Sequence, residues 1–246
     1  MIRLEAVQKL TEALKEAGKV AVLTGAGMST ASGIPDFRSR GGLYDRELNV
    51  EAILSESYFH SKPKLFWKYF KEIFGFQQIR EVEPNAGHLF LAELEAMGKT
   101  VTIITQNVDG LHRKAGSSRV LEVHGSLDQA RCPKCHEEYG LKDLLAEEIP
   151  RCRKHDVILK PDVVLFEGRV KHMEEAVDAI CGCELFIVLG TSLTVYPVKE
   201  LPNYIRHDRG ITKAIINKEP TMMDELFDIV VHEEIVPVLN RVKQTI

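Results

Sequence analysis

Seven short apolar runs recur along the chain, and their pattern is the feature that most constrains its fold. Most of these runs are apolar at every position, which is typical of strands buried on both faces of a parallel sheet. The predicted strands are Val20–Thr24, Val101–Thr105, Val120–Val123, Asp162–Leu165, Leu185–Leu189, Ala214–Asn217 and Ile229–Val231. The predicted helices between them are Leu4–Ala17, Gly87–Met97 and Met173–Cys181. This succession indicates an α/β fold with a Rossmann-like, doubly wound parallel sheet.

Two stretches interrupt the alternation and predict a second, smaller domain. Eight of the 17 aromatic residues lie between Tyr58 and Phe76, and those at 66, 70 and 74 have the spacing of an inward-facing helical stripe. The other stretch, Arg131–His155, is rich in charge and holds three of the five cysteines. We expect a Rossmann-like domain of residues 1–40, 85–128 and 158–246, and a small domain of a helical insertion, 41–84, and a cysteine-rich module, 129–157.

Composition and charge exclude several classes of protein. The 246 residues are 44% apolar and 28% charged, which is typical of a globular chain rather than a disordered or fibrous one. The net charge of −4 argues against holding nucleic acid by charge. The longest uncharged stretch, Val20–Pro35, has 16 residues and is too short to span a membrane. With an odd cysteine count and no signal-peptide pattern, we expect a cytoplasmic protein without disulfides, and a monomer.

A glycine-rich loop follows the first predicted strand directly, with the sequence TGAGMSTASGIPDFRS over Thr24–Ser39. Gly25 and Gly27 would let the backbone turn tightly and approach a phosphate. The third glycine of the usual dinucleotide fingerprint is displaced to Gly33, so a plain strand-to-helix turn is the alternative. Arg38, just beyond, could pair a pyrophosphate bidentately or form a surface salt bridge.

Polar side chains also follow the other predicted strands. Gln106, Asn107 and Asp109 could bind ribose hydroxyls and a carboxamide, or could form a turn that caps a helix. His124 has the side chain of a general base at neutral pH, with a purely structural histidine as the alternative. The later strands are followed by Gly190, Thr191, Ser192 and Asn217. Because the carboxyl ends of parallel strands share one edge, these groups predict a ligand crevice there.

The cysteines predict a metal site. Two pairs of ligands separated by 16 residues have the spacing of a closed, structural zinc site. The predicted ligands are Cys132, Cys135, Cys152 and His155. His136, beside the first pair, is a rival for the fourth position. Cys181 and Cys183 precede a core strand and are interpreted as small buried apolar residues.

These motifs, in this order, resemble the sirtuin family of NAD-dependent protein-lysine deacylases, of the bacterial or archaeal type. The resemblance rests on GAGMSTASGIPDFR, TQNVDGLH, the His-Gly at His124, the paired cysteines, PDVVLF, GTSLTVYP and the Ile-Ile-Asn ending at Asn217. It extends over roughly Lys19 to Val238. It implies a Rossmann-like domain and a small domain of a zinc module and a helical insertion, with NAD and an acyl-lysine peptide between them.

The resemblance also implies roles for individual residues. The NAD loop would be lined by Ala26, Thr30, Phe37 and Arg38. The ribose and nicotinamide pocket would be lined by Gln106, Val108 and Asp109, with Asp109 on the carboxamide, Asn107 positioning a water and His124 as general base. The adenosine half would contact Thr191, Ser192, Asn217 and, near the C-terminus, Ile235. The acyl-lysine tunnel would be lined by Val164, Phe166 and Val195, which would pair with the peptide as an added strand.

The implied reaction is NAD-dependent removal of an acyl group from lysine, giving nicotinamide, free lysine and O-acyl-ADP-ribose. Protein ADP-ribosyl transfer from the same NAD site is the alternative. A conventional dehydrogenase is disfavoured by the irregular glycine pattern, and a zinc-ribbon nucleic-acid binder by the net charge. Family members that remove succinyl or malonyl groups carry a Tyr and an Arg, three residues apart, on the insertion helix. This chain has Tyr69 and Glu72, or Phe70 and Ile73, at that spacing, so we expect a neutral acyl group.

Two departures from the family pattern concern the small domain and the peptide. The usual fourth cysteine ligand is replaced by His155, for which a site of three cysteines and one histidine is expected. The usual Phe-Gly-Glu after the PDVVL run is replaced by Phe166-Glu167-Gly168, at the segment that would touch the peptide.

Overall fold

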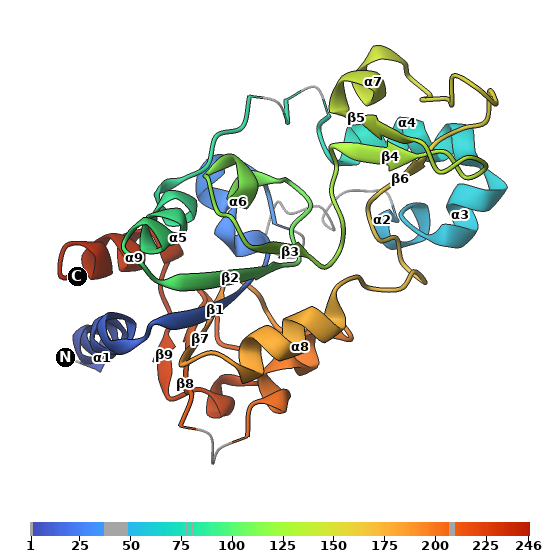
Figure 1. The fold of residues 1–246 in the computed structure, drawn as a ribbon. Coiled ribbons are helices and arrows are strands. Elements are labelled where there is room, and N and C mark those ends of the chain that lie inside the picture. Colours follow the sequence, from blue (N-terminus) through green and yellow to red (C-terminus); the bar gives the residue numbers. More distant parts are fainter. Residues whose placement is uncertain (1, 37–48, 77, 80, 207–209) are drawn as a thin grey trace.

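A six-stranded parallel sheet forms the centre of the protein in a computed structural model, which describes residues 2–36, 49–76, 78–79, 81–206 and 210–246 (Figure 1). Its strands are β1 (Lys19–Thr24), β2 (Thr100–Thr105), β3 (Val120–Glu122), β7 (Leu185–Leu189), β8 (Thr212–Ile216) and β9 (Ile229–Val231). They lie in the order β3-β2-β1-β7-β8-β9, and every neighbouring pair is parallel. The order reverses between β1 and β7, as in a doubly wound sheet. The predicted fold class is confirmed.

Helices cover both faces of this sheet (Figure 1). One face packs against α1 (Ile2–Glu16), α5 (Ala86–Ala96) and α9 (Ile235–Lys243), and the other against α8 (Met173–Cys181) and the 3-10 segment η4 (Val198–Tyr204). Along β1, Val20 and Val22 belong to the first core, whereas Ala21 and Leu23 belong to the second. Burial on both sides is the reason that the strands read as unbroken apolar runs.

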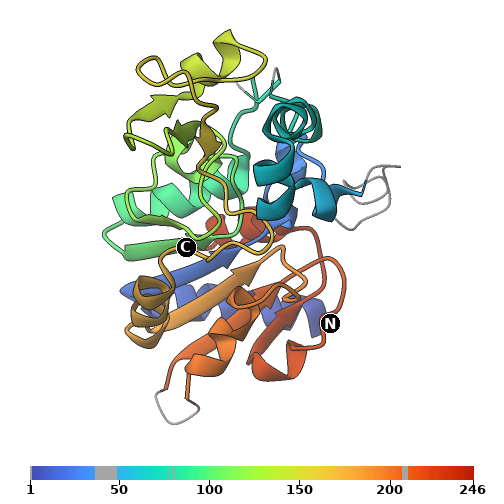
Figure 2. The same cartoon turned by 90° about the vertical axis from the view of Figure 1, so that its right-hand side faces the viewer.

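The small domain lies beyond the carboxyl ends of the strands and has an apolar core of its own (Figure 2). Its helices are α2 (Val50–Ile53), α3 (Glu56–Ser61), α4 (Pro63–Ile73) and α7 (Leu141–Ala146), and its sheet holds β4 (Gln129–Arg131), β5 (Glu138–Gly140) and β6 (Lys160–Pro161). Phe66 and Phe70 are fully buried in this core together with Cys132 and Tyr139. One core therefore joins the helical insertion to the cysteine-rich module, while the exact domain boundaries stay a prediction.

The prediction of a strand over Asp162–Leu165 is wrong. This segment follows β6 and belongs to neither sheet. Its backbone bonds to the connection between β3 and β4: the N–H of Asp162 donates to the Gln129 carbonyl at 2.9 Å, and that of Val164 to the His124 carbonyl at 2.8 Å. Its buried apolar residues, Val163 and Leu165, belong to the small domain's core. An apolar run indicates that a segment is buried, and this segment is buried in the small domain's core instead of in the main sheet.

The remaining elements are short. They are η1 (Ala26–Met28), η2 (Thr30–Ser32), α6 (Leu111–Lys114) and η6 (Asp224–Leu226). Within the described part of the chain, no helix combines the length and the apolar character needed to cross a bilayer.

Candidate active site

Three glycines bring two loops into contact where the strand order reverses. The N–H of Gly25 donates to the Leu189 carbonyl at 3.0 Å, and that of Gly27 to the Gly190 carbonyl at 2.9 Å. A Cβ on Gly25 would lie 2.6 Å from the Cβ of Thr191, and one on Gly27 would lie 2.8 Å from the Cα of Gly190. Glycine is required here because the backbones approach so closely. The crevice at such a reversal is where doubly wound sheets bind dinucleotides.

Side chains bond the loop after β2 to the glycine-rich loop after β1. The Nδ2 of Asn107 donates to the Gly25 carbonyl at 3.0 Å and to the Oγ of Ser29 at 3.1 Å. The Oγ of Ser29 donates to the Asp109 carboxylate at 2.6 Å, and the N–H of Leu111 donates to its other oxygen at 2.9 Å. Burial raises the pKa of Asp109, and these two hydrogen bonds oppose the rise. Asp109 thus accepts a hydrogen bond from the first residue of helix α6 and also bonds to the glycine-rich loop. The predicted turn is present, and the predicted contact with a carboxamide stays a prediction.

Gln106 links the histidine predicted to be the base to the loop after β7. Its side-chain Nε2 donates to the Oγ1 of Thr191 at 3.1 Å, and its carbonyl oxygen lies 3.0 Å from the Nδ1 of His124. A carbonyl can only accept, so Nδ1 carries the proton and Nε2 of His124 is the basic nitrogen. Burial lowers the pKa of His124, against the opposing effect of the Gln106 hydrogen bond. The imidazole is therefore neutral at physiological pH, as a general base must be.

The residues predicted for the adenosine half follow β7 and β8. Ser192 is half-buried, and its Oγ lies 3.1 Å from the Oγ1 of Thr194. Asn217 is half-buried and donates from Nδ2 to the Glu219 carbonyl at 2.6 Å. Ile235, the first residue of α9, is different: its side chain is 6% exposed and packs in the core on the α1 face of the sheet. Its predicted contact with NAD would have to come from its backbone.

Other predicted cofactor residues lie around the same loops. Ala26 is half-buried in η1, and the Oγ1 of Thr30 donates to the Gly27 carbonyl at 3.0 Å. Val108 packs against the small domain's core, and its carbonyl accepts from the N–H of Leu127 at 2.9 Å. Phe37 and Arg38 lie outside the described residues.

The segment predicted to bind the peptide alternates its side chains between core and surface. Val163 and Leu165 are buried, whereas Val164 is half-buried and Phe166 is 41% exposed. Val195, in the loop after β7, is half-buried. An open hollow of about 440 Å³ borders Phe166 and Glu167 and is also lined by residues of α2 and α3. An exposed aromatic beside such a hollow can contact an extended chain.

Glu167 occupies an unusual backbone position in that segment. Its φ is +74°, in the left-handed region that favours glycine, and its neighbour Gly168 has no positive φ. Its carboxylate accepts from the Oγ of Ser57 at 2.6 Å and from the N–H of the same residue at 3.1 Å. The exchange of Gly and Glu relative to the family pattern therefore puts Glu167 in the strained position and ties its side chain to α3.

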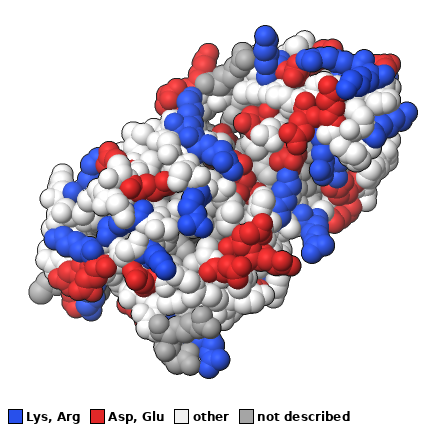
Figure 3. All heavy atoms as spheres, in the orientation of Figure 1, with Lys and Arg blue, Asp and Glu red and all other residues white. Residues whose placement is uncertain are grey.

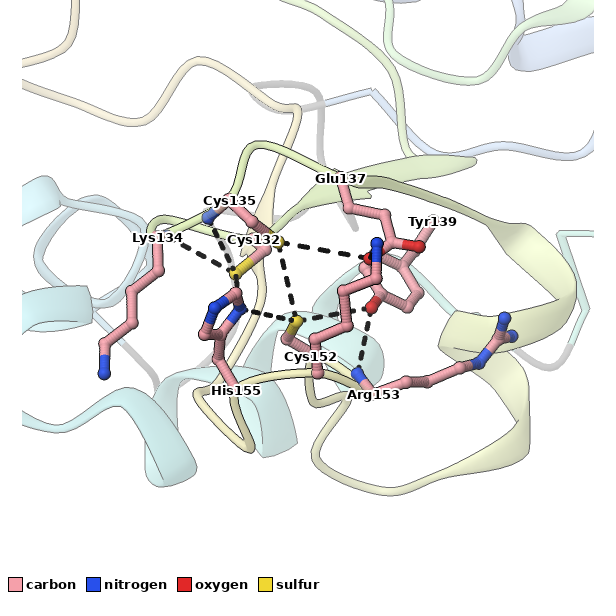
Figure 4. A network of polar contacts seen from close by, with 9 residues as sticks. Cys132, Lys134, Cys135, Glu137, Tyr139, Cys152, Arg153 and His155 are labelled. Atoms are coloured by element: carbon pink, nitrogen blue, oxygen red, sulfur yellow. Dashed lines mark hydrogen bonds and ion pairs between the residues drawn. The ribbon is translucent and has the colours of Figure 1, made fainter.

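The four predicted metal ligands converge in the small domain (Figure 4). The Nδ1 of His155 lies 3.5 Å from the Sγ of Cys152 and 3.9 Å from that of Cys132, and the Sγ atoms of Cys135 and Cys152 are 3.8 Å apart. Ligands of a tetrahedral zinc ion with Zn–S bonds of about 2.3 Å lie about 3.7 Å apart, so the cluster fits zinc. The hydroxyl of Tyr139 donates to the Sγ of Cys152 at 3.4 Å, an outer contact of the kind that orients metal ligands.

Sequence reasoning missed Ser29 and the histidine pair His88 and His112. Ser29 lies inside the glycine-rich motif, but its bond to Asp109 joins residues 80 positions apart. His112 lies inside the TQNVDGLH motif, yet its partners come from other elements. No local pattern could have identified these contacts.

Known proteins resemble this chain over nearly its whole length. The family model described as "Sir2 family" matches residues 25–197. "NAD-dependent protein deacetylase 2" of Geobacillus kaustophilus is 51% identical over 230 residues, which cover 93% of each chain. "NAD-dependent protein deacetylase" of Bacillus subtilis is 48% identical over 229 residues, covering 90% of this chain and 93% of that one.

Solved structures agree with the sequence relatives. One described as "Structural Basis for the Mechanism and Regulation of Sir2 Enzymes" is 39% identical, covers 98% of this chain and 99% of its own, and has a TM-score of 0.85. A complex of Sir2 with a p53 peptide and NAD+ is 33% identical over 97% and 98% of the two chains, with a TM-score of 0.84. A Sir2 variant with a deacetylated p53 peptide and 3′-O-acetyl ADP-ribose, 32% identical over the same shares, has a TM-score of 0.88.

Proposed function

Because the chain belongs to the Sir2 family, we propose that it is an NAD-dependent protein-lysine deacetylase that yields nicotinamide, free lysine and O-acyl-ADP-ribose. The observation that carries this proposal is the hydrogen bond between Nδ1 of His124 and the Gln106 carbonyl, at 3.0 Å. It leaves a neutral, basic Nε2 beside the crevice at the strand ends. His124 follows β3 at this crevice, and relatives of the chain are named as NAD-dependent protein deacetylases.

The polar groups at the crevice suit NAD. When bound, NAD supplies a ribose carbon whose bond to nicotinamide can be broken. The Asp109 carboxylate would accept from the nicotinamide carboxamide, and Gln106 would bind the ribose next to it. Ser192 and Asn217 would bind the ribose of the adenosine half. Asn107 has both Nδ2 hydrogens engaged, by Gly25 and Ser29, so its Oδ1 would accept from a ribose hydroxyl or a water. The phosphates would lie over the loop from Gly25 to Thr30; the roles that the resemblance implies for Phe37 and Arg38 concern residues outside the described part of the chain.

Water must be kept from the reacting groups until the acyl group is in place, because it would otherwise hydrolyse NAD. The acyl-lysine would enter between Val164, Phe166 and Val195 and bring its amide toward His124. The backbone geometry supports this, since the N–H of Val164 donates to the His124 carbonyl at 2.8 Å. The backbone of the proposed base is thus hydrogen-bonded to the backbone of a residue proposed to line the tunnel.

The same region supports a preference for neutral acyl groups. Phe70 and Ile73 are buried in the small domain's core. The one lysine between positions 69 and 73, Lys71, donates to the carbonyls of Leu144 and Glu147. Its charge therefore faces α7, and no described cation of this helix segment is placed to meet a carboxylate. Equal turnover of succinyl-lysine and acetyl-lysine peptides would contradict this preference.

Product analysis tests the reaction. We would incubate the protein with NAD and an acetyl-lysine peptide, beside His124→Ala and the exposed control His172→Ala. Nicotinamide, free lysine and O-acetyl-ADP-ribose should form in equal amounts with the unchanged protein and the control, and fail to form with His124→Ala. Nicotinamide release without deacetylation, with ADP-ribose found on protein, would instead identify an ADP-ribosyltransferase.

The proposal includes a structural zinc ion on Cys132, Cys135, Cys152 and His155, and a cytoplasmic monomer that binds no specific nucleic acid. None of the five cysteines, all of which the structure describes, is in a disulfide, which suits a reducing compartment. Basic and acidic side chains are interspersed on the face shown in Figure 3, unlike the continuous basic surface of a nucleic-acid binder. Size-exclusion chromatography with light scattering would test the monomer.

A further inference from the structure

Two histidines with no part in the proposed reaction are buried behind the crevice. His88 lies in α5 and His112 in α6, and they are 0% and 2% exposed. Their ring centroids are 4.7 Å apart, and the rings are inclined by 58°. Burying two imidazoles side by side is costly unless their nitrogens are satisfied. The hydrogen bonds of the pair therefore decide what it does.

The bonds of His88 determine where its proton is. Its Nδ1 lies 3.3 Å from the backbone N–H of Asn85, in the cap of α5. A backbone N–H can only donate, so Nδ1 accepts and the proton of the neutral ring is on Nε2. A doubly protonated ring would have no acceptor at this nitrogen. His88 is thus an Nε2–H imidazole.

The bonds of His112 determine its proton in the same way. The N–H of Asn107 donates to the Oγ1 of Thr105 at 3.1 Å, and the hydroxyl of Thr24 donates to the same oxygen at 2.8 Å. Thr24 has then used its only proton, so it must accept from the Nε2 of His112, 3.0 Å away. His112 is therefore also an Nε2–H imidazole, with a lone pair on Nδ1.

The two nitrogens that remain are complementary. The Nε2 of His88 and the Nδ1 of His112 are both buried, and neither has a hydrogen-bond partner among the described residues. The first is a donor and the second an acceptor, on rings 4.7 Å apart. One bridging water would join them, and an unsatisfied buried pair would cost stability.

We propose that His88 and His112 are positioning residues that hold together the two loops of the nicotinamide pocket through a one-way relay of hydrogen bonds. The relay begins at the N–H of Asn85 and ends at the Oγ1 of Thr105, to which the N–H of Asn107 also donates. Both ends reach the crevice. The Nδ2 of Asn85 donates to the Met28 carbonyl at 2.8 Å and to the Oγ of Ser32 at 3.1 Å, in the glycine-rich loop.

Asn107, which is bonded to Thr105 at the far end of the relay, also has its side chain bonded to the glycine-rich loop. Asn107 bonds to Gly25 and Ser29, and Ser29 in turn bonds to Asp109. The histidines touch neither NAD nor peptide in the proposed complex. Their loss should therefore weaken binding at the nicotinamide end and leave peptide binding unchanged. This inference takes the identity of the ligand from the proposed function. The protonation pattern of the two histidines is independent of that function.

The protonation pattern can be measured without any activity. We would label histidine with ¹⁵N and record long-range ¹H–¹⁵N spectra of the unliganded protein from pH 5 to pH 8, assigning His88 and His112 with His88→Asn and His112→Gln. Both rings should be Nε2–H tautomers and remain neutral over this range. An Nδ1–H tautomer or an imidazolium at either position at pH 7 would overturn the relay.

The consequence for binding is tested with a graded pair of variants. His112→Leu removes the donor to Thr24, whereas His112→Gln keeps an N–H at the place of Nε2. We expect the NAD dissociation constant, measured by calorimetry, to rise roughly tenfold in His112→Leu and to be largely restored in His112→Gln. The dissociation constant of an acetyl-lysine peptide should stay within twofold in both.

A matched control separates positioning from a general loss of stability. Thr11→Val removes a buried hydrogen bond in α1, from the Thr11 hydroxyl to the Val7 carbonyl at 2.9 Å, remote from the crevice. It should lower Tm without changing NAD binding. Equal NAD affinity in His112→Leu and the unchanged protein, or equal losses of NAD and peptide affinity in both His112 variants, would refute the positioning role. Failure of the unchanged protein to bind NAD would refute the proposed function instead.

Discussion

The Nδ1 of His124 lies 3.0 Å from the carbonyl oxygen of Gln106, so a residue after β3 is oriented by the backbone of a residue after β2. Because β2 and β3 are adjacent parallel strands, their carboxyl ends bring these two residues together. The bond assigns the proton to Nδ1 and the basic lone pair to Nε2. The tautomer of the proposed base is thus determined by the neighbouring strand ends of the sheet.

The pH dependence of the proposed activity follows from the burial of His124. A base must be unprotonated, and burial lowers the pKa of His124 from its ordinary value of 6.5. We expect kcat to be independent of pH above 6.5 and to fall only at lower pH. The measurement is kcat from pH 5 to pH 8 with saturating NAD and peptide. A midpoint at or above pH 6.5 would show that the ring is stabilised as a cation.

The histidine pair should make the fold sensitive to acid. Burial lowers the pKa of His88 to about 4 and that of His112 to about 3, whereas both are near 6.5 when unfolded. Between these values the unfolded state binds more protons, so the free energy of unfolding falls as the pH falls below 6.5, by up to about 1.4 kcal/mol per pH unit for each ring.

Urea denaturation at pH 7, 6 and 5 measures that slope. The variant His88→Leu should lose about half of the histidine contribution, since one of the two titrating rings is gone. An identical pH dependence in the variant and the unchanged protein would show that carboxyl groups alone cause it.

A methyl group on Gly27 should destabilise the protein and weaken NAD binding. Its Cβ would lie 2.8 Å from the Cα of Gly190. That contact is with backbone, which cannot move aside as a flexible side chain could. We expect Gly27→Ala to cost about 1–3 kcal/mol, the range for overpacking. Gly140→Ala is the control, because a Cβ there would meet nothing within 4 Å. Equal Tm values for the two variants would contradict the close approach of the loops.

Metal binding should depend on His155 and not on its neighbour in the sequence, His136. We expect one zinc ion per chain, lost in His155→Ala, retained in His155→Cys and unaffected in His136→Ala. Since Cys132 and Cys152 are buried in the core shared with α4, loss of the metal should also lower Tm. Metal content by mass spectrometry and Tm by calorimetry test this. Retention of zinc in His155→Ala would assign the fourth position to another residue.

Replacing Glu167 by glycine should stabilise the protein. A non-glycine residue at φ +74° costs about 1–2 kcal/mol, whereas the exposed contact with Ser57 contributes less because it is screened by solvent. We expect Glu167→Gly to raise the free energy of unfolding by about 0.5–1 kcal/mol. Ser57→Ala, which removes only the contact, should lower it slightly. A decrease in Glu167→Gly larger than that in Ser57→Ala would show that the contact outweighs the strain.

The sequence by itself determined the class of fold, the strands of the main sheet and the four side chains of the cluster that fits zinc. Continuous apolar runs such as Leu185–Leu189 are local signals of a strand buried on both faces, and the structure confirms them as strands. The polar residues after those runs predicted a crevice, because parallel strands end at one edge. The pairing of Cys132 and Cys135 with a second pair 16 residues later is likewise a local spacing.

Only the tertiary structure decided which groups meet at the crevice. The order of the strands puts Gly27 against Gly190 and Ser29 against Asp109, and no local periodicity encodes that order. Burial alone does not say which core an apolar run enters, so Asp162–Leu165 resembled a strand of the main sheet. The protonation of His88 and His112 depends on donors supplied by Asn85 and Thr24. A hydrogen bond has a direction that depends on both partners, and these partners become neighbours only when the chain has folded.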